Sequence, residues 1–227
     1  MFGSLFRNMP TITKNLLIIN VLVWIAQIIL PKIGIDLTEL LGLHFWMASD
    51  FNPAQIVTYM FLHSDSDFTH LFFNMFSLLM FGPLLERTLG EKRFLFYYIT
   101  CGIGAALVQE LVWQFTWKDI FVPMFANQAG WSMAEAHQAL DMAIAQGQNI
   151  PALNALLTVG ASGGIFGILL AFGMLFPNLP LYIMFIPVPI KAKYMVWGYG
   201  AIEFFFGISG TMSSVAHFAH LGGMLFG

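Results

Sequence analysis

The chain has very few charged residues for its length of 227 residues. Only 9% of them are Asp, Glu, Lys or Arg, whereas an ordinary globular domain carries about 25%. Hydrophobic residues make up 58% of the sequence and aromatic residues 16%. This balance excludes a water-soluble fold of this size as well as a disordered chain. We therefore expect an integral membrane protein.

Basic clusters and cysteine pairs are also missing. Nine basic and twelve acidic residues give a net charge of −3, and no basic block is present that could neutralise a run of phosphates. Nucleic-acid binding is therefore not expected. The single cysteine, Cys101, lies in an apolar stretch without a partner, which excludes a disulfide framework and a thiolate metal site.

Six long apolar runs predict membrane-spanning helices, each of which needs about 20 mostly apolar residues. The runs cover about 16–30, 68–85, 94–113, 156–176, 192–208 and 214–227. The fold class we predict is all-α, a polytopic membrane helix bundle of six transmembrane helices with interfacial elements on the outer face. Residues 1–227 would form one domain, and the sixth span is cut short at the chain end, so we expect a longer gene product.

The distribution of basic residues predicts the orientation. A cytoplasmic N-terminus places seven of the nine Lys and Arg residues inside. These are Arg7, Lys14, Arg87, Lys92, Arg93, Lys191 and Lys193. Because no organelle-targeting presequence is visible, we expect a bacterial inner membrane. In the outer connection 118–155, Ser132 and Glu135 form a capping-box pattern that predicts a short amphipathic surface helix.

Polar side chains occur near the outer ends of three predicted spans. They are His70 and Asn74 in the second, Ser162 in the fourth, and His217 and His220 in the sixth. The four-residue spacing places His70 and Asn74 on one helix face. Taken singly, such residues also suit an interfacial histidine, an interhelical hydrogen bond or a packing serine.

Small residues accompany two of these groups. Gly160, Gly163 and Gly164 surround Ser162, and Gly223 follows His220. Small faces let transmembrane helices approach closely. We expect these glycines to support the helix packing that brings the serine and the histidine together.

The predicted depth in the membrane is similar for the polar residues of the three spans. The second, fourth and sixth spans all descend from the outer face, so His70, Asn74, Ser162 and His220 share a layer about 10 Å thick by helix rise. An imidazole can activate a serine hydroxyl, and the N–H groups that begin a helix can stabilise an oxyanion. The pattern predicts acyl transfer. No acidic residue neighbours His220 in sequence or in the assigned layer, so we expect a dyad without a carboxylate.

Metal and cofactor sites are not predicted. His63, His70, His217 and His220 are possible ligands by type, but no His-Glu-x-x-His motif or cysteine ligand accompanies them. The intramembrane acids Glu110 and Glu203 are expected to bond to other helices, and a proton-transfer role for either stays open.

Three motifs in order carry a family resemblance. They are His70-x-x-x-Asn74, Gly160-x-Ser162-Gly163 and Ala219-His220-x-Gly222-Gly223, on the second, fourth and sixth spans. With them the chain resembles the rhomboid family of intramembrane serine proteases. Supporting matches are residues 58–63 and 85–90, while Ala54-Gln55 stands where many members have Trp-Arg.

The resemblance implies specific roles. Ser162 would be the nucleophile and His220 the general base, with oxyanion contacts from His70, Asn74 and the Ser162 backbone. Substrates would be single-span membrane proteins, cleaved within the lipid bilayer near its outer face, so the partners are transmembrane proteins and the bilayer itself.

Substrate access is expected between the second and fifth spans. Trp197, Phe204 and Phe205 on the fifth span offer bulky side chains that could gate this route. The polar loop 209–214 above His220 is expected to act as a movable cap.

Two other function classes predict different sequence features. A catalytically silent rhomboid-like scaffold would bind membrane helices, but such relatives typically lack the serine or the histidine. A transporter or channel would favour ionisable groups near the bilayer midplane and repeats between its halves. This chain concentrates its polar groups near one face.

Overall fold

The computed structural model describes residues 8–182, 188–209 and 216–227, so most of the predicted cap at 209–214 lies outside the described residues. The chain is mostly helical, as predicted. The helices are α2 (Thr11–Ile29), α3 (Leu37–Leu41), α4 (Gln55–Thr58), α5 (Phe68–Leu89), α6 (Glu91–Ala129), α7 (Met133–Ala145), α8 (Ser162–Leu175), α9 (Ala192–Ser209) and α10 (His217–Leu225). Short 3₁₀ turns cover Leu30–Ile33, Tyr59–Phe61 and Pro151–Ala155.

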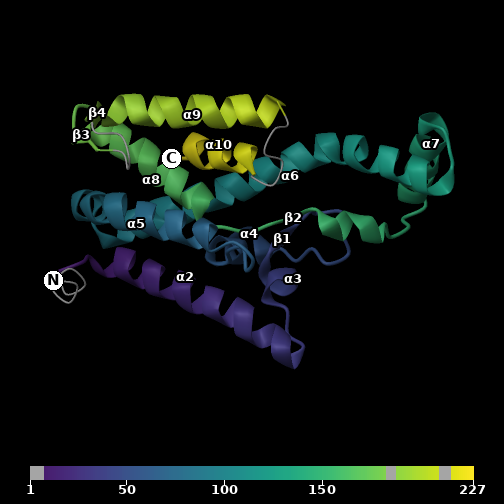
Figure 1. The fold of residues 1–227 in the computed structure, drawn as a ribbon, viewed down its shortest axis with the longest axis horizontal. Helices are drawn as coiled ribbons and strands as arrows, with labels where there is room; N and C mark the ends of the chain where they lie inside the picture. Colours follow the sequence, from purple (N-terminus) through teal and green to yellow (C-terminus); the bar gives the residue numbers. More distant parts are fainter. Residues whose placement is uncertain (1–7, 183–187, 210–215) are drawn as a thin grey trace.

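Three described helices are long and apolar enough to cross a membrane. They are Thr11–Ile33, Phe68–Leu89 and Glu91–Ala129, and a shorter apolar helix covers Ser162–Leu175. The long helices lie side by side along the longest axis, with α2 at the lower edge of the bundle and α9 at the upper edge in Figure 1. The short helix α10 packs against α6, α8 and α9.

Two helix boundaries differ from the expected spans. The third span was expected to end near Trp113, but α6 continues to Ala129, and the second half buries Trp117, Phe121 and Val122. This half packs on α7, beyond the end of the bundle at which α5, α8 and α10 begin (Figure 1). An apolar run predicts only the part of a helix that spans the membrane. The helix itself continues as far as its side chains pack against other elements.

The fourth span begins later than expected. Helix α8 starts at Ser162, not at residue 156. Strand β2 (Leu157–Thr158) instead pairs antiparallel with β1 (Leu43–His44) of the connection between α2 and α5, and a second ribbon joins β3 (Pro180–Leu181) to β4 (Ile190–Lys191). The ribbon β1–β2 therefore links the loop between α2 and α5 to the segment that leads into Ser162.

The predicted surface helix is confirmed as α7. Ser132 caps it, and the reciprocal hydrogen bonds of a capping box with Glu135 are both present. Ala136 and Leu140 form its buried face. The helix lies against α6 at the far end of the molecule (Figure 1).

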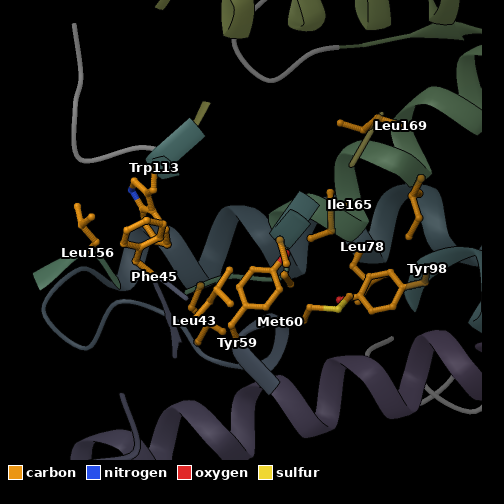
Figure 2. Packing of buried hydrophobic residues seen from close by; sticks show 14 of the residues in the cluster. Leu43, Phe45, Tyr59, Met60, Leu78, Tyr98, Trp113, Leu156, Ile165 and Leu169 are labelled. Atoms are coloured by element: carbon orange, nitrogen blue, oxygen red, sulfur yellow. The ribbon is translucent and has the colours of Figure 1, made fainter. Parts of the chain in front are cut away.

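Residues from the loop between α2 and α5 and residues from the helices share one hydrophobic core. Figure 2 shows Leu43, Phe45 and Met60 of the loop region packed among side chains from α5, α6 and α8. All three are fully buried. The loop is thus an integral part of the fold, and the residues that lead into α5 and α8 rest on it.

Glycines set the spacing of α6, α8 and α10. A β-carbon on Gly223 of α10 would overlap the carbonyl oxygen of Gly163 on α8, and one on Gly164 would lie 2.6 Å from the ring of Tyr98 on α6. Backbone contact of this kind needs small residues on both helices. Gly160 differs, because it lies before α8 in a turn.

Candidate active site

Ser162 stands at the first residue of α8. The preceding Gly160 adopts φ = +139°, a conformation that other residues rarely adopt, and its N–H donates to the carbonyl of Tyr59 at 3.0 Å. The first i to i−4 hydrogen bond of the helix runs from Ile165 N–H to Ala161. The N–H groups before it point out of the helix start, which favours negative charge beside the hydroxyl.

His220 lies in the first turn of α10 and faces Ser162. Its Nε2 is 2.8 Å from Ser162 Oγ, within hydrogen-bond distance. Phe166, one turn after Ser162 on α8, stacks on the imidazole with ring centroids 4.3 Å apart and planes 7° apart. The stacked ring fixes the plane in which the histidine can accept a proton.

His70 presents its second ring nitrogen to the same place. Its Nδ1 accepts a hydrogen bond from the Ser64 N–H at 3.2 Å, so the proton of the neutral ring is on Nε2. A β-carbon built on Gly160 would lie 3.0 Å from this Nε2 and 3.4 Å from Ser162 Oγ. Gly160 therefore keeps the space between His70 and Ser162 open, and Nε2–H is a donor available to an anion there.

Asn74 follows one turn later on α5. Its Nδ2 donates to the carbonyl of His70 at 2.8 Å, and its side chain is nearly fully buried. Both residues line the same cavity as Ser162 and His220. The structure thus brings together all four polar residues that the sequence placed in one layer.

A cavity of about 570 Å³ connects these groups with the neighbouring helices. Phe73 and Phe81 of α5 line one side, and Phe166 of α8 and Tyr199 of α9 line another. The mixture of aromatic walls and a few convergent polar groups is typical of substrate sites. The volume suits several side chains of an extended peptide.

The expectation that no carboxylate lies near His220 is wrong. Glu203 on α9 places Oε2 3.0 Å from His220 Nδ1 and 2.7 Å from His217 Nδ1. Helix α9 ascends where α10 descends, so a residue late in α9 reaches the same layer as one early in α10. Counting the depth of Glu203 from the C-terminal end of its helix would have placed it in the same layer as His220.

The remaining histidines and acidic residues lie at different places relative to the cavity. His217 is buried against Glu203 and is absent from the residues that line the cavity. Among the described residues, two groups of possible metal ligands have their ligand atoms within 4.8 Å of one another, and neither contains His63 or His70. The groups are Glu203, His217 and His220, and Glu39, His44 and Asp50.

His63 is fully buried and packs on His70 with ring centroids 5.2 Å apart. Burial, together with the nearby His70, lowers the pKa of His63 to about 3. His63 is therefore neutral, and its ring supports that of His70.

The family model of the rhomboid domain matches residues 50–227, which include every residue of the site described above. The chain belongs to the rhomboid family. Rhomboids are a family of membrane serine proteases. This chain is accordingly a multi-pass helical membrane protein.

Two relatives are similar to this rhomboid. Rhomboid protease AarA of Providencia stuartii is 28% identical over 226 residues, which cover 95% of this chain and 69% of the relative. Putative rhomboid protease YdcA of Bacillus subtilis (strain 168) is 47% identical over 49 residues, which cover 22% of this chain and 24% of the relative. The chain thus aligns with under two thirds of YdcA.

Proposed function

We propose that this rhomboid is an intramembrane serine endopeptidase that hydrolyses peptide bonds of single-span membrane proteins near the outer membrane face. The 2.8 Å contact between Ser162 Oγ and His220 Nε2 carries the proposal. The two relatives, which are named as a putative rhomboid protease and a rhomboid protease, support it. A catalytically silent scaffold that only binds membrane helices does not require this contact.

The geometry supports a two-stage acyl transfer. His220 Nε2 takes the proton from Ser162 Oγ while the oxygen attacks the scissile carbonyl carbon. His70 Nε2–H, the Asn74 amide and the N–H groups at the start of α8 stabilise the oxyanion. His220 then gives its proton to the leaving amine, and a water molecule, activated by the same histidine, hydrolyses the acyl-enzyme.

The membrane arrangement we propose has six spans in one domain. Helices α2, α5, α6, α8, α9 and α10 would cross or enter the bilayer, with the N-terminus in the cytoplasm of a bacterial inner membrane. The basic residues at the cytoplasmic ends of these helices support this orientation. The chemistry needs no metal and no cofactor.

Substrates would approach between α5 and α9. The cavity is lined from both helices, by Phe73 and Tyr199 among others, while Trp197 on α9 is 79% exposed. Phe204 and Phe205 are also exposed on α9. A bulky gate slows access, so Trp197→Ala is expected to raise the rate of cleavage. An unchanged rate and an unchanged range of substrates would argue against this route.

The direct test measures cleavage of a single-span substrate by the full chain in proteoliposomes. Ser162→Ala and His220→Ala should each abolish cleavage. Ser132→Ala and His137→Ala, which change exposed residues of the α7 region, serve as matched controls and should retain it. Cleavage that survives Ser162→Ala would show that the nucleophile is a different residue.

A further inference from the structure

One carboxylate oxygen of α9 faces two imidazoles of α10. Glu203 Oε2 is 2.7 Å from His217 Nδ1 and 3.0 Å from His220 Nδ1. The side chains of all three residues are at most 12% exposed. In so dry a setting, an ionised carboxylate needs partners of this kind to remain charged.

The position of the proton on His220 gives this contact a catalytic consequence. To take the proton of Ser162, Nε2 must be free of hydrogen, so the neutral ring must carry its proton on Nδ1. Nδ1 is the nitrogen that faces Glu203. A carboxylate there favours the productive tautomer and stabilises the imidazolium that forms during the reaction.

His217 holds the carboxylate in place. Its Nδ1 makes the shorter, well-aligned hydrogen bond to Oε2, whereas His220 Nδ1 is close to the same oxygen but has no well-aligned acceptor among the described residues. Phe206 packs on the ring of His217 with centroids 5.6 Å apart. His217 therefore orients Glu203, and Glu203 in turn faces His220. Helices α9 and α10, which carry these residues, pack on each other (Figure 1).

Hydrogen bonding explains the distances better than a metal ion. Two ligands about 2.0–2.1 Å from a tetrahedral zinc ion would be separated by about 3.3 Å. The contact between Glu203 and His217 is shorter, at 2.7 Å, which is the length of a charge-assisted hydrogen bond. The cluster thus resembles the carboxylate that orients a catalytic histidine in other serine proteases.

We propose that Glu203 is a positioning residue that fixes the tautomer of His220, and that His217 anchors Glu203. This inference rests on the proposed roles of Ser162 and His220. The titratable groups that face His220 are Glu203, His217 and His70, so variants at Glu203 change its electrostatic surroundings without touching the nucleophile.

The test compares Glu203→Gln and Glu203→Asp with wild type, measuring kcat and KM separately between pH 5.5 and 9. Glu203→Gln keeps the shape and removes the charge. We expect kcat to fall roughly 10- to 100-fold with KM little changed, as for other groups that orient a histidine. The acid limb of the profile should move to lower pH, because the protonated ring loses its counter-charge.

Two further variants separate positioning from a structural role. Glu203→Asp restores the charge and should recover part of kcat and of the wild-type pH profile. Glu110→Gln, the matched control, neutralises another buried helix carboxylate that binds the Trp46 N–H instead, and should leave the profile unchanged. Labelling of Ser162 by a serine-directed probe should slow in Glu203→Gln in parallel with kcat.

Three results would overturn the inference. The first is a Glu203→Gln enzyme with wild-type kcat and pH profile. The second is an Asp variant that folds but behaves like Gln at every pH. The third is loss of wild-type cleavage on chelation with recovery by zinc, which would make the cluster a metal site. Failure of the proposed function differs from all three, since wild type itself would then be inactive or Ser162→Ala active.

Discussion

At the scale of single residues, Gln55 shows how one side chain organises the loop between α2 and α5. It is 2% exposed, and its Oε1 accepts hydrogen bonds from the N–H groups of His44 and Asn52. Its Nε2 donates to the carbonyl of Asp50 at 2.9 Å. Gln55 thus anchors the loop at the place where many rhomboids carry Trp-Arg, a solution that the sequence alone did not indicate.

Gln55→Ala is expected to lower the free energy of unfolding by about 2–3 kcal/mol, because buried backbone donors and an acceptor lose their partner. Thermal unfolding of the purified protein in detergent measures this change. Gln148→Ala, at an exposed glutamine, is the control and should unfold like wild type. Equal stability of the Gln55 and Gln148 variants would contradict the anchoring role.

His63 makes the stability depend on pH. Burial and the neighbouring His70 lower the pKa of its imidazole from 6.5 in the unfolded chain to about 3 in the folded protein. Between these values only the unfolded chain binds the proton. The free energy of unfolding therefore keeps its full value above pH 6.5 and falls below it, by up to about 1.4 kcal/mol per pH unit.

His63→Phe should flatten this dependence. The aromatic ring can keep its packing on His70, while the titrating group is gone. Unfolding by denaturant at pH 7.5, 6.5, 5.5 and 4.5 gives the two profiles, and their difference isolates His63 from the carboxylates that titrate in both proteins. Parallel profiles would show that His63 binds its proton equally well in the folded and the unfolded chain.

At the scale of elements, the active site depends on how closely α8 and α10 approach. Gly223 leaves no room for a β-carbon beside the Gly163 carbonyl, and Gly222 is similarly confined by Val108 of α6. Ser162 and His220 stand at the first turns of these two helices. Their 2.8 Å contact is therefore set by backbone packing and not by side-chain flexibility.

Gly223→Ala should push α10 away from α8 and reduce cleavage by roughly 100-fold or more, since a shift of about 1 Å at a reacting group has this effect. Gly198→Ala is the matched control, because a β-carbon there meets nothing within 4 Å on the exposed face of α9. The control should keep full activity. Full activity of Gly223→Ala, measured with the same substrate, would refute the packing argument.

The sequence predicted elements better than their ends. The capping box at Ser132 has a local cause and was found, whereas the fourth helix was expected from residue 156 and begins at Ser162. The pairing of residues 157–158 with 43–44 is nonlocal and leaves no periodic signal in so short a strand. The contact of Glu203 with His220 was missed for the same reason, since it depends on how two antiparallel helices align.

At the scale of the whole molecule, the C-terminal part of helix α6 and helix α7 lie beyond one end of the bundle. This is the end at which α5, α8 and α10 begin (Figure 1). The candidate active site lies near that end. If the site faces the outside, α7 must also be outside, and the loop between α5 and α6 must be in the cytoplasm. The orientation and the location of the chemistry are therefore tested together.

Gln138→Cys on α7 and Lys92→Cys at the start of α6 report the two sides, because both positions are exposed. The native Cys101 is buried and should stay unlabelled, so wild type is the control. In intact spheroplasts a membrane-impermeant maleimide should label Gln138→Cys, and it should label Lys92→Cys only after lysis. The reverse pattern would place Ser162 near the cytoplasmic face, and water for hydrolysis would then have to enter the cavity from that side.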